Sequence, residues 1–128
     1  STFSGQSVEI LPQTFTLDVD ANNISDIFDV ILIARYLTQG RDRIPNATLE
    51  SLVVSATGKG DEIKTTISGG IDALDVDDNN ITDVFDAILI ARYLTQGRDR
   101  IPDATLEALV ASATGKSTEI KAAIAALL

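Results

Sequence analysis

Apolar residues recur at helical spacing between residues 26 and 38. They follow i, i+3, i+4, i+7 and i+10, as on one face of an α-helix. Other apolar side chains cover most of the remaining circumference, so we expect this helix to be buried on more than one side. Gly40 is expected to end it in the left-handed conformation. The main apolar face consists of Ile27, Val30, Ile31, Ala34 and Leu37.

Two further helices are predicted downstream. One begins at Asn46, a residue type preferred at helix N-caps, and runs to Gly58. Its expected core face consists of Leu49, Leu52, Val53 and Ala56. The next begins near Asp61 and carries Ile63 and Ile67 at helical spacing.

This pattern occurs twice in the chain. Residues 17–71 align without a gap with residues 74–128, and 40 of the 55 aligned positions are identical. A unit of this length is marginal in burial by itself, so we expect the two copies to pack together. Residues 1–16 match neither copy and are interpreted as an extended lead-in with at most one short strand.

The predicted fold is therefore all-α. It consists of two near-identical repeats, each an acidic loop followed by three helices, packed as one body with pseudo-two-fold symmetry. The alternative is a linear array in which the units contact each other by translation. No sheet is expected beyond, at most, a short pairing between the two loops.

Composition excludes several classes of function. Lys and Arg total 10 and Asp and Glu total 19, giving a net charge of −9, which argues against nucleic acid as a partner. The chain has no Cys and no His, so thiolate or imidazole metal sites and His-based catalysis are excluded, and we expect no enzyme activity. No apolar run is long enough to span a bilayer. The first five residues lack a basic stretch leading into an apolar one, so we expect no signal peptide within this chain.

Nine of the 19 carboxylates fall within two loops of 12 residues, 18–29 and 75–86. Each loop has oxygen-bearing side chains at positions 1, 3, 5, 9 and 12 and a backbone carbonyl at position 7, as in an EF-hand calcium loop. The expected metal ligands are Asp18, Asp20, Asn22, Ile24 (through its carbonyl), Asp26 and Asp29 in the first loop, and Asp75, Asp77, Asn79, Ile81 (through its carbonyl), Asp83 and Asp86 in the second. Position 6 is Asn23 or Asn80 instead of Gly, and Asn is the next best residue for positive φ. The apolar residue at position 7 instead of 8 leaves open the register around Asn23 and Asp26, and around their counterparts Asn80 and Asp83.

The size of the electrostatic repulsion distinguishes between two interpretations of these loops, a metal site and a solvated acidic turn. Four carboxylates that lie about 5 Å from one another form six pairs. Each pair repels by about 0.8 kcal/mol at the dielectric constant of water. The sum, about 5 kcal/mol, is comparable to the stability of a small domain, so a fold that gathers them needs a cation. The alternative is an acidic turn with Asp26 near the N-cap of the following helix, which accounts for one Asp in each loop.

Both copies contain Leu-Asp-Val-Asp-x-Asn-Asn followed by Asp-x-Phe-Asp-x-Ile-Leu-Ile-Ala-Arg-Tyr-Leu. In these motifs the chain resembles the calcium-binding repeats of dockerin-type domains of secreted bacterial proteins, and the dockerin-like repeats of large bacterial surface proteins. The resemblance implies tandem Ca²⁺ loops, an extracellular or cell-surface setting and docking onto a partner module. By residue matches it implies as ligands Asp18, Asp20, Asn22 and Asp29, and Asp75, Asp77, Asn79 and Asp86.

We therefore expect a non-enzymatic, Ca²⁺-stabilised module with two Ca²⁺ per chain, used for protein–protein attachment or as a structural spacer. The partner would be a cohesin-like receptor or neighbouring repeats of a larger protein, and a homodimer is compatible with the apolar end of the second copy. The alternative function is an EF-hand sensor that opens on binding Ca²⁺. Such sensors expose a Met-rich groove, and this chain contains no Met.

Overall fold

The computed structural model describes residues 15–128, and this part of the chain is all-helical. Six α-helices alternate with four short 3₁₀ segments, and no strand occurs among the described residues. The short pairing between the two loops that the sequence left open does not occur among these residues, and the predicted extended lead-in lies largely outside them. The α-helices are α1 Ile27–Thr38, α2 Asn46–Glu50, α3 Gly60–Gly69, α4 Val84–Thr95, α5 Asp103–Glu107 and α6 Ser117–Leu127. The 3₁₀ segments are η1 Arg41–Arg43, η2 Val54–Ala56, η3 Arg98–Arg100 and η4 Ala111–Ala113.

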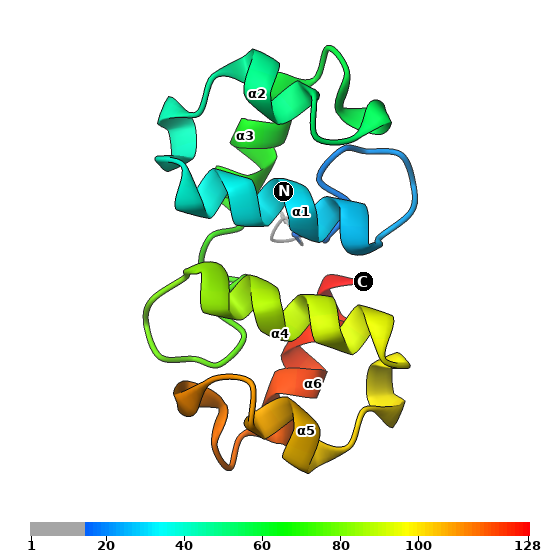
Figure 1. Ribbon diagram of the computed structural model, residues 1–128, viewed down its shortest axis with the longest axis vertical. Coiled ribbons are helices and arrows are strands. Elements are labelled where there is room, and N and C mark those ends of the chain that lie inside the picture. Colours follow the sequence, from blue (N-terminus) through cyan, green and yellow to red (C-terminus); the bar gives the residue numbers. More distant parts are fainter. Residues whose placement is uncertain (1–14) are drawn as a thin grey trace, which may run out of the picture.

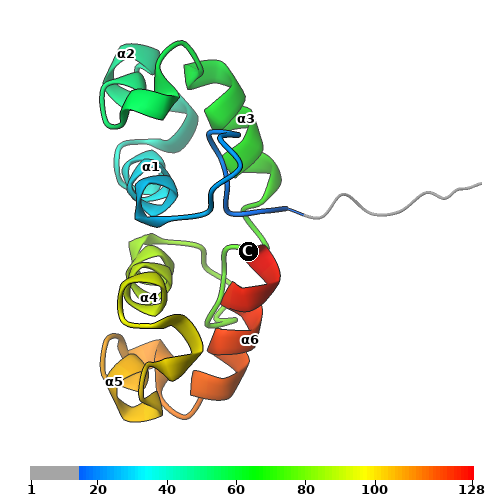
Figure 2. The same cartoon turned by 90° about the vertical axis from the view of Figure 1, so that its right-hand side faces the viewer.

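Helices α1 and α4 lie side by side and run in opposite directions (Figure 1). Their facing apolar side chains come from Ile27, Val30 and Ala34 on α1 and from the equivalent positions of α4. Helices α3 and α6 form a second layer behind them (Figure 2). Every element of the second half begins 57 residues after its counterpart in the first half. That a two-fold axis relates the halves stays a prediction.

The first helix forms as its periodicity predicts. Leu32, Ile33 and Tyr36 are buried, so the helix is covered on more than one side. Gly40 follows it with φ of 94°, in the left-handed region, as expected. The hydroxyl of the buried Tyr36 donates a hydrogen bond of 3.0 Å to Asp42, which satisfies its polar group inside the core.

The second helix is shorter than the sequence predicts. Helix α2 ends at Glu50 and the chain is extended at Val53, with φ of −140° and ψ of 151°, before the 3₁₀ segment η2. Leu49, Val53 and Ala56 are nevertheless buried, as expected. The break turns Ser55 toward the first acidic loop, where its hydroxyl donates a hydrogen bond to Asp20. A contact with a distant segment therefore overrides the local periodicity.

Asn46 is also not the N-cap that the sequence predicts. Helix α2 begins at Asn46 itself after Pro45, whose φ of −61° suits the entry to a helix. The Asn46 side chain instead donates a hydrogen bond of 3.0 Å to Asp61 on α3. Asn46 therefore connects two helices of the same half instead of capping its own.

The two halves are joined by polar contacts as well as by α1 and α4. The guanidinium of Arg41 donates a hydrogen bond of 2.9 Å to the carbonyl of Thr82. The backbone N–H of Leu17 donates one of 2.7 Å to the carbonyl of Leu127 at the end of α6. The two ends of the described chain thus meet beside α3 and α6, and each acidic loop lies at the N-terminal end of α1 or α4 (Figures 1 and 2).

Candidate metal centres

Each acidic loop brings three carboxylates together. In the first loop Asp18, Asp20 and Asp29 each offer an oxygen, and these oxygens lie within 4.8 Å of one another. Asp75, Asp77 and Asp86 make the same arrangement in the second. We call these groups the first and second triads. Asp29 and Asp86 are in the first turns of α1 and α4, whereas the other carboxylates come from the loops.

The loop backbone curls around the first carboxylate of each triad. In the first loop the backbone N–H groups of Asn22 and Asn23 donate hydrogen bonds of 3.1 and 2.7 Å to Asp18. In this turn Asn23 has a φ of 70°, in the left-handed region, and Asn80 has a φ of 69°. The residue that replaces the expected Gly therefore adopts the conformation predicted for it.

Asp29 is held from two sides. Its carboxylate accepts hydrogen bonds from the backbone N–H of Val19 at 3.0 Å and of Asp26 at 2.9 Å. The same contacts fix Asp86 in the second triad, from Val76 and Asp83. Each triad therefore ties the beginning of its loop to the beginning of the following helix.

Asp26 and Asp83 lie outside the triads. Each is the N-cap of its helix, and its carboxylate accepts a hydrogen bond of 3.1 Å from the N–H of Phe28 or Phe85. With Asp29 or Asp86 it forms a reciprocal capping box. The acidic-turn interpretation is therefore correct for this one Asp of each loop and does not account for the triads.

The remaining expected ligands lie along the loops. The side-chain oxygens of Asn22 and Asn79 each accept a hydrogen bond of 3.1 Å from the N–H two residues later, so they stabilise the loop itself. The side chains of Ile24 and Ile81 are exposed and aliphatic, so these residues can offer a metal only their backbone carbonyls.

Burial is the main influence on the pKa values of the triad carboxyl groups. Asp29 and Asp86 are at most 1% exposed. Burial, with the neighbouring carboxylates, raises the pKa of each to about 7, despite the hydrogen bonds from backbone N–H groups. Burial and the adjoining Asp77 also raise the pKa of Asp75. For Asp77 burial favours a higher pKa, but hydrogen bonds from Ser112 and the neighbouring carboxyl groups outweigh it and lower the pKa.

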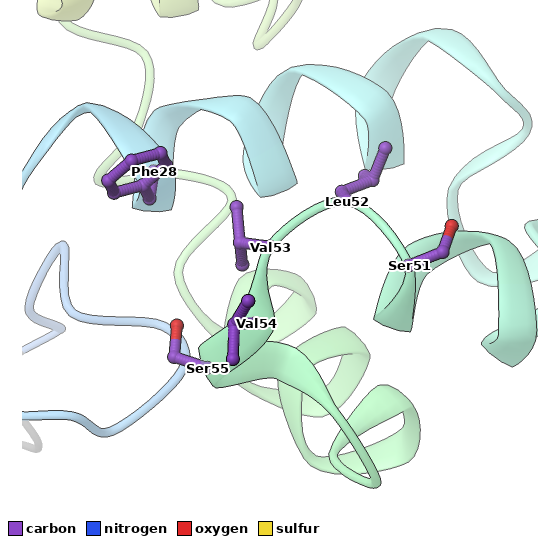
Figure 3. Close-up of a pocket in the computed structure, with 6 residues that line it drawn as sticks. All are labelled: Phe28, Ser51, Leu52, Val53, Val54 and Ser55. Atoms are coloured by element: carbon purple, nitrogen blue, oxygen red, sulfur yellow. The ribbon is translucent and has the colours of Figure 1, made fainter.

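A Ser and a Lys from the second part of each half support the triads. Ser55 donates a hydrogen bond to the Asp20 carboxylate, and Lys59 donates one of 2.7 Å to the Asp20 backbone carbonyl. Ser112 and Lys116 make the same contacts to Asp77, with 2.8 Å for the ammonium group. Ser55 lies on η2 beside the acidic loop (Figure 3). The sequence does not single out these residues, because their only signal is identity between the copies, which most positions share.

One carboxylate oxygen of the second triad has no hydrogen-bond partner among the described residues. It is Oδ1 of Asp77, a residue that is 1% exposed. A buried carboxylate oxygen without a donor is costly, because burial removes its water without replacement. Such an atom fits a site completed by a cation.

No protein-family model matches this chain, and neither a curated protein nor a solved structure matches it. A functional proposal therefore rests on the arrangement of the side chains in the two loops. The candidate ligand atoms of both triads are all oxygens, which suit hard cations such as Ca²⁺ and Mg²⁺. Among residues 15–128 no helix has the length and hydropathy needed to cross a membrane.

Proposed function

We propose that each acidic loop binds one Ca²⁺, giving two ions per chain. The observation that carries this proposal is the pair of triads, each of which gathers three carboxylates within 4.8 Å, two of them buried. Without a cation, the backbone hydrogen bonds to Asp29 and Asp86 offset only part of the cost of burial and like-charge repulsion, which is why the pKa of both groups is raised. The amide oxygens of Asn22 and Asn79 and the carbonyls of Ile24 and Ile81 would complete the ligand sets. Asp26 and Asp83 are assigned to the helix caps.

Calcium suits these loops better than magnesium. Ca²⁺ takes six to eight oxygens in flexible geometry, and one short loop that offers carboxylates, an amide and a carbonyl can supply them. Mg²⁺ demands near-ideal octahedral geometry and keeps several waters, so it uses fewer protein ligands. The donor set thus favours Ca²⁺.

The role that fits such sites is a Ca²⁺-stabilised, non-enzymatic module of a secreted or cell-surface protein, used for attachment or as a spacer. Support for attachment comes from apolar side chains beside the first loop. Ile24 and Phe28 are about half exposed and Val54 is 92% exposed. Phe28 and Val54 line one hollow of about 550 Å³ together with residues 51–53 and Ser55 (Figure 3). A cohesin-like receptor or a neighbouring repeat is the kind of partner proposed for this surface.

Calorimetric titration of the metal-free protein with Ca²⁺ tests the proposal. The expected result is two ions per chain, and one ion each for the variants Asp29→Asn and Asp86→Asn. Mg²⁺ at the same concentrations is the control and should bind more weakly. Binding of fewer than two Ca²⁺ at millimolar concentration, or two ions retained in both variants, would contradict the assignment.

A further inference from the structure

The second acidic loop has a contact that the first lacks. Arg41, in the turn after α1, reaches across to the other half and donates a hydrogen bond of 2.9 Å from Nη2 to the carbonyl of Thr82. Thr82 is buried, and its hydroxyl donates a hydrogen bond of 2.6 Å to the carbonyl of Ile71. The loop is thereby held by two segments outside it.

Arg98 of the second repeat is equivalent to Arg41, and Ser25 of the first repeat is equivalent to Thr82. No hydrogen bond joins the Arg98 guanidinium to the Ser25 carbonyl in the described structure, in contrast to Arg41 and Thr82. Ser25 is also less buried than Thr82. The same Arg therefore supports only one of the two loops.

The supported carbonyl lies where it affects metal binding. Thr82 stands between Ile81, whose carbonyl is an expected ligand, and Asp83, the N-cap of the helix that carries Asp86. A loop held in its binding conformation before the ion arrives loses less conformational entropy on binding. The second triad also contains Asp77, whose buried Oδ1 has no donor among the described residues.

We propose that Arg41 is a positioning residue for the second loop, so that the second site binds Ca²⁺ more tightly than the first. The affinity part of this inference rests on the proposed function. Arg41 follows α1, whose first turn contains Asp29 of the first triad. The contact thus also joins the helix of the first site to the loop of the second.

The test compares Arg41→Gln with the matched variant Arg98→Gln. Amide hydrogen exchange is measured first, in the metal-free proteins, so that this readout does not depend on Ca²⁺. Loss of one hydrogen bond from a charged donor should speed exchange in loop 75–83 about fivefold in Arg41→Gln, with loop 18–26 unchanged. Arg98→Gln should leave both loops unchanged, and Arg41→Lys should restore part of the protection.

Calcium affinity of each site is then measured with the other site disabled by Asp29→Asn or Asp86→Asn. The second site should be the tighter one, and Arg41→Gln should weaken it about fivefold while Arg98→Gln leaves the first site unchanged. Unchanged exchange in loop 75–83, or equal effects of the two Arg variants on their loops, would overturn the positioning role. Failure of the wild type to bind Ca²⁺ would instead refute the proposed function and the affinity difference, with the exchange result still deciding whether Arg41 holds the loop.

Discussion

The first acidic loop has Ala21 where the second has Asp78, and both residues are exposed with positive φ. On the neighbouring segment Val54 is 92% exposed in the first half, and its counterpart in the second half is Ala111. The residues of the triads and their side-chain supports are the same in both halves. Both loops keep the three Asp residues, the capping Asp, and the supporting Ser and Lys. The contacts differ in detail, because Oδ1 of Asp20 accepts a hydrogen bond from the backbone N–H of Asn22, whereas Oδ1 of Asp77 has no partner among the described residues.

A second difference between the halves involves two positions that change together. In the first half Gly60 packs so closely that an added Cβ would lie 2.8 Å from the Cβ of Asn46. In the second half these positions are Ser117 and Asp103, and the Ser117 hydroxyl donates a hydrogen bond of 2.7 Å to Asp103. Asp103 also pairs with Lys121 at 2.8 Å. Each half therefore uses its own combination to join its second and third helices.

The largest effect is expected from the triads themselves. Asp86→Asn removes the charge of a buried carboxylate of the second triad at nearly constant shape, and it should abolish the Ca²⁺ site proposed there. Asp78→Asn removes a charge from the same loop at an exposed position outside the triad and should leave two ions bound. Stoichiometry from equilibrium dialysis checks this. Similar losses in both variants would mean that total negative charge, and not coordination, holds the ion.

The supporting Ser residues should have the next largest effect. Ser112→Ala deletes the donor to Asp77 and should weaken Ca²⁺ binding at the second site by about 10- to 100-fold, the usual effect of losing a contact to a metal ligand. Ser55→Ala should do the same at the first site. Ser51→Ala is the control, since the second half already has Ala108 at that position. Affinities equal to wild type in Ser55→Ala and Ser112→Ala would show that these contacts do not orient the ligands.

Replacing Asn46 and Gly60 with the residues found at 103 and 117 tests whether the two halves are interchangeable at these positions. Gly60→Ser alone forces a side chain against Asn46 and Glu50 and should destabilise the protein by about 1–3 kcal/mol. Asn46→Asp supplies the acceptor present in the second half, and Asp61→Thr, the residue found at position 118, removes the carboxylate that Asn46 contacts. Adding this pair to Gly60→Ser should recover part of the loss. Urea unfolding of Gly60→Ser, of the pair and of all three together gives the coupling free energy. Strictly additive effects would show that the two differences are independent.

The last expected effect is a reversal of the pH dependence of stability when Ca²⁺ binds. In the metal-free protein the pKa of Asp29 and Asp86 is raised to about 7, so the folded state keeps protons that the unfolded chain releases above a pKa of 3.8. Stability from these groups is present at low pH and is lost as the pH rises from about 4 to about 7. With saturating Ca²⁺ the trend should reverse, because the ion needs the ionised carboxylates. Urea midpoints at pH 5 and pH 7.5 check this, and a common direction with and without Ca²⁺ would refute it.

Local signals explain what the sequence could predict. The apolar spacing of 26–38, the positive φ of Asn23 and the gathering of Asp18, Asp20 and Asp29 all arise within one helix or one short loop. Asp26 belongs to this group as well, because an Asp three residues before another acidic residue at a helix start is a capping-box pattern.

Contacts between distant segments explain what it could not. The break in the second predicted helix at Val53 brings Ser55 to Asp20, 35 residues earlier in the chain. The hydrogen bond from Arg41 spans 41 residues to Thr82. Neither partner is visible in the local pattern, since each depends on how the helices pack.

Crystals grown with Ca²⁺ offer the most direct test of the two proposed sites. Anomalous difference maps collected at long wavelength should show one peak at each triad. The carboxylate oxygens of Asp18, Asp20 and Asp29, and those of the second triad, should lie about 2.3–2.6 Å from the peaks. Peaks elsewhere, or no anomalous signal at the triads in millimolar Ca²⁺, would contradict the account.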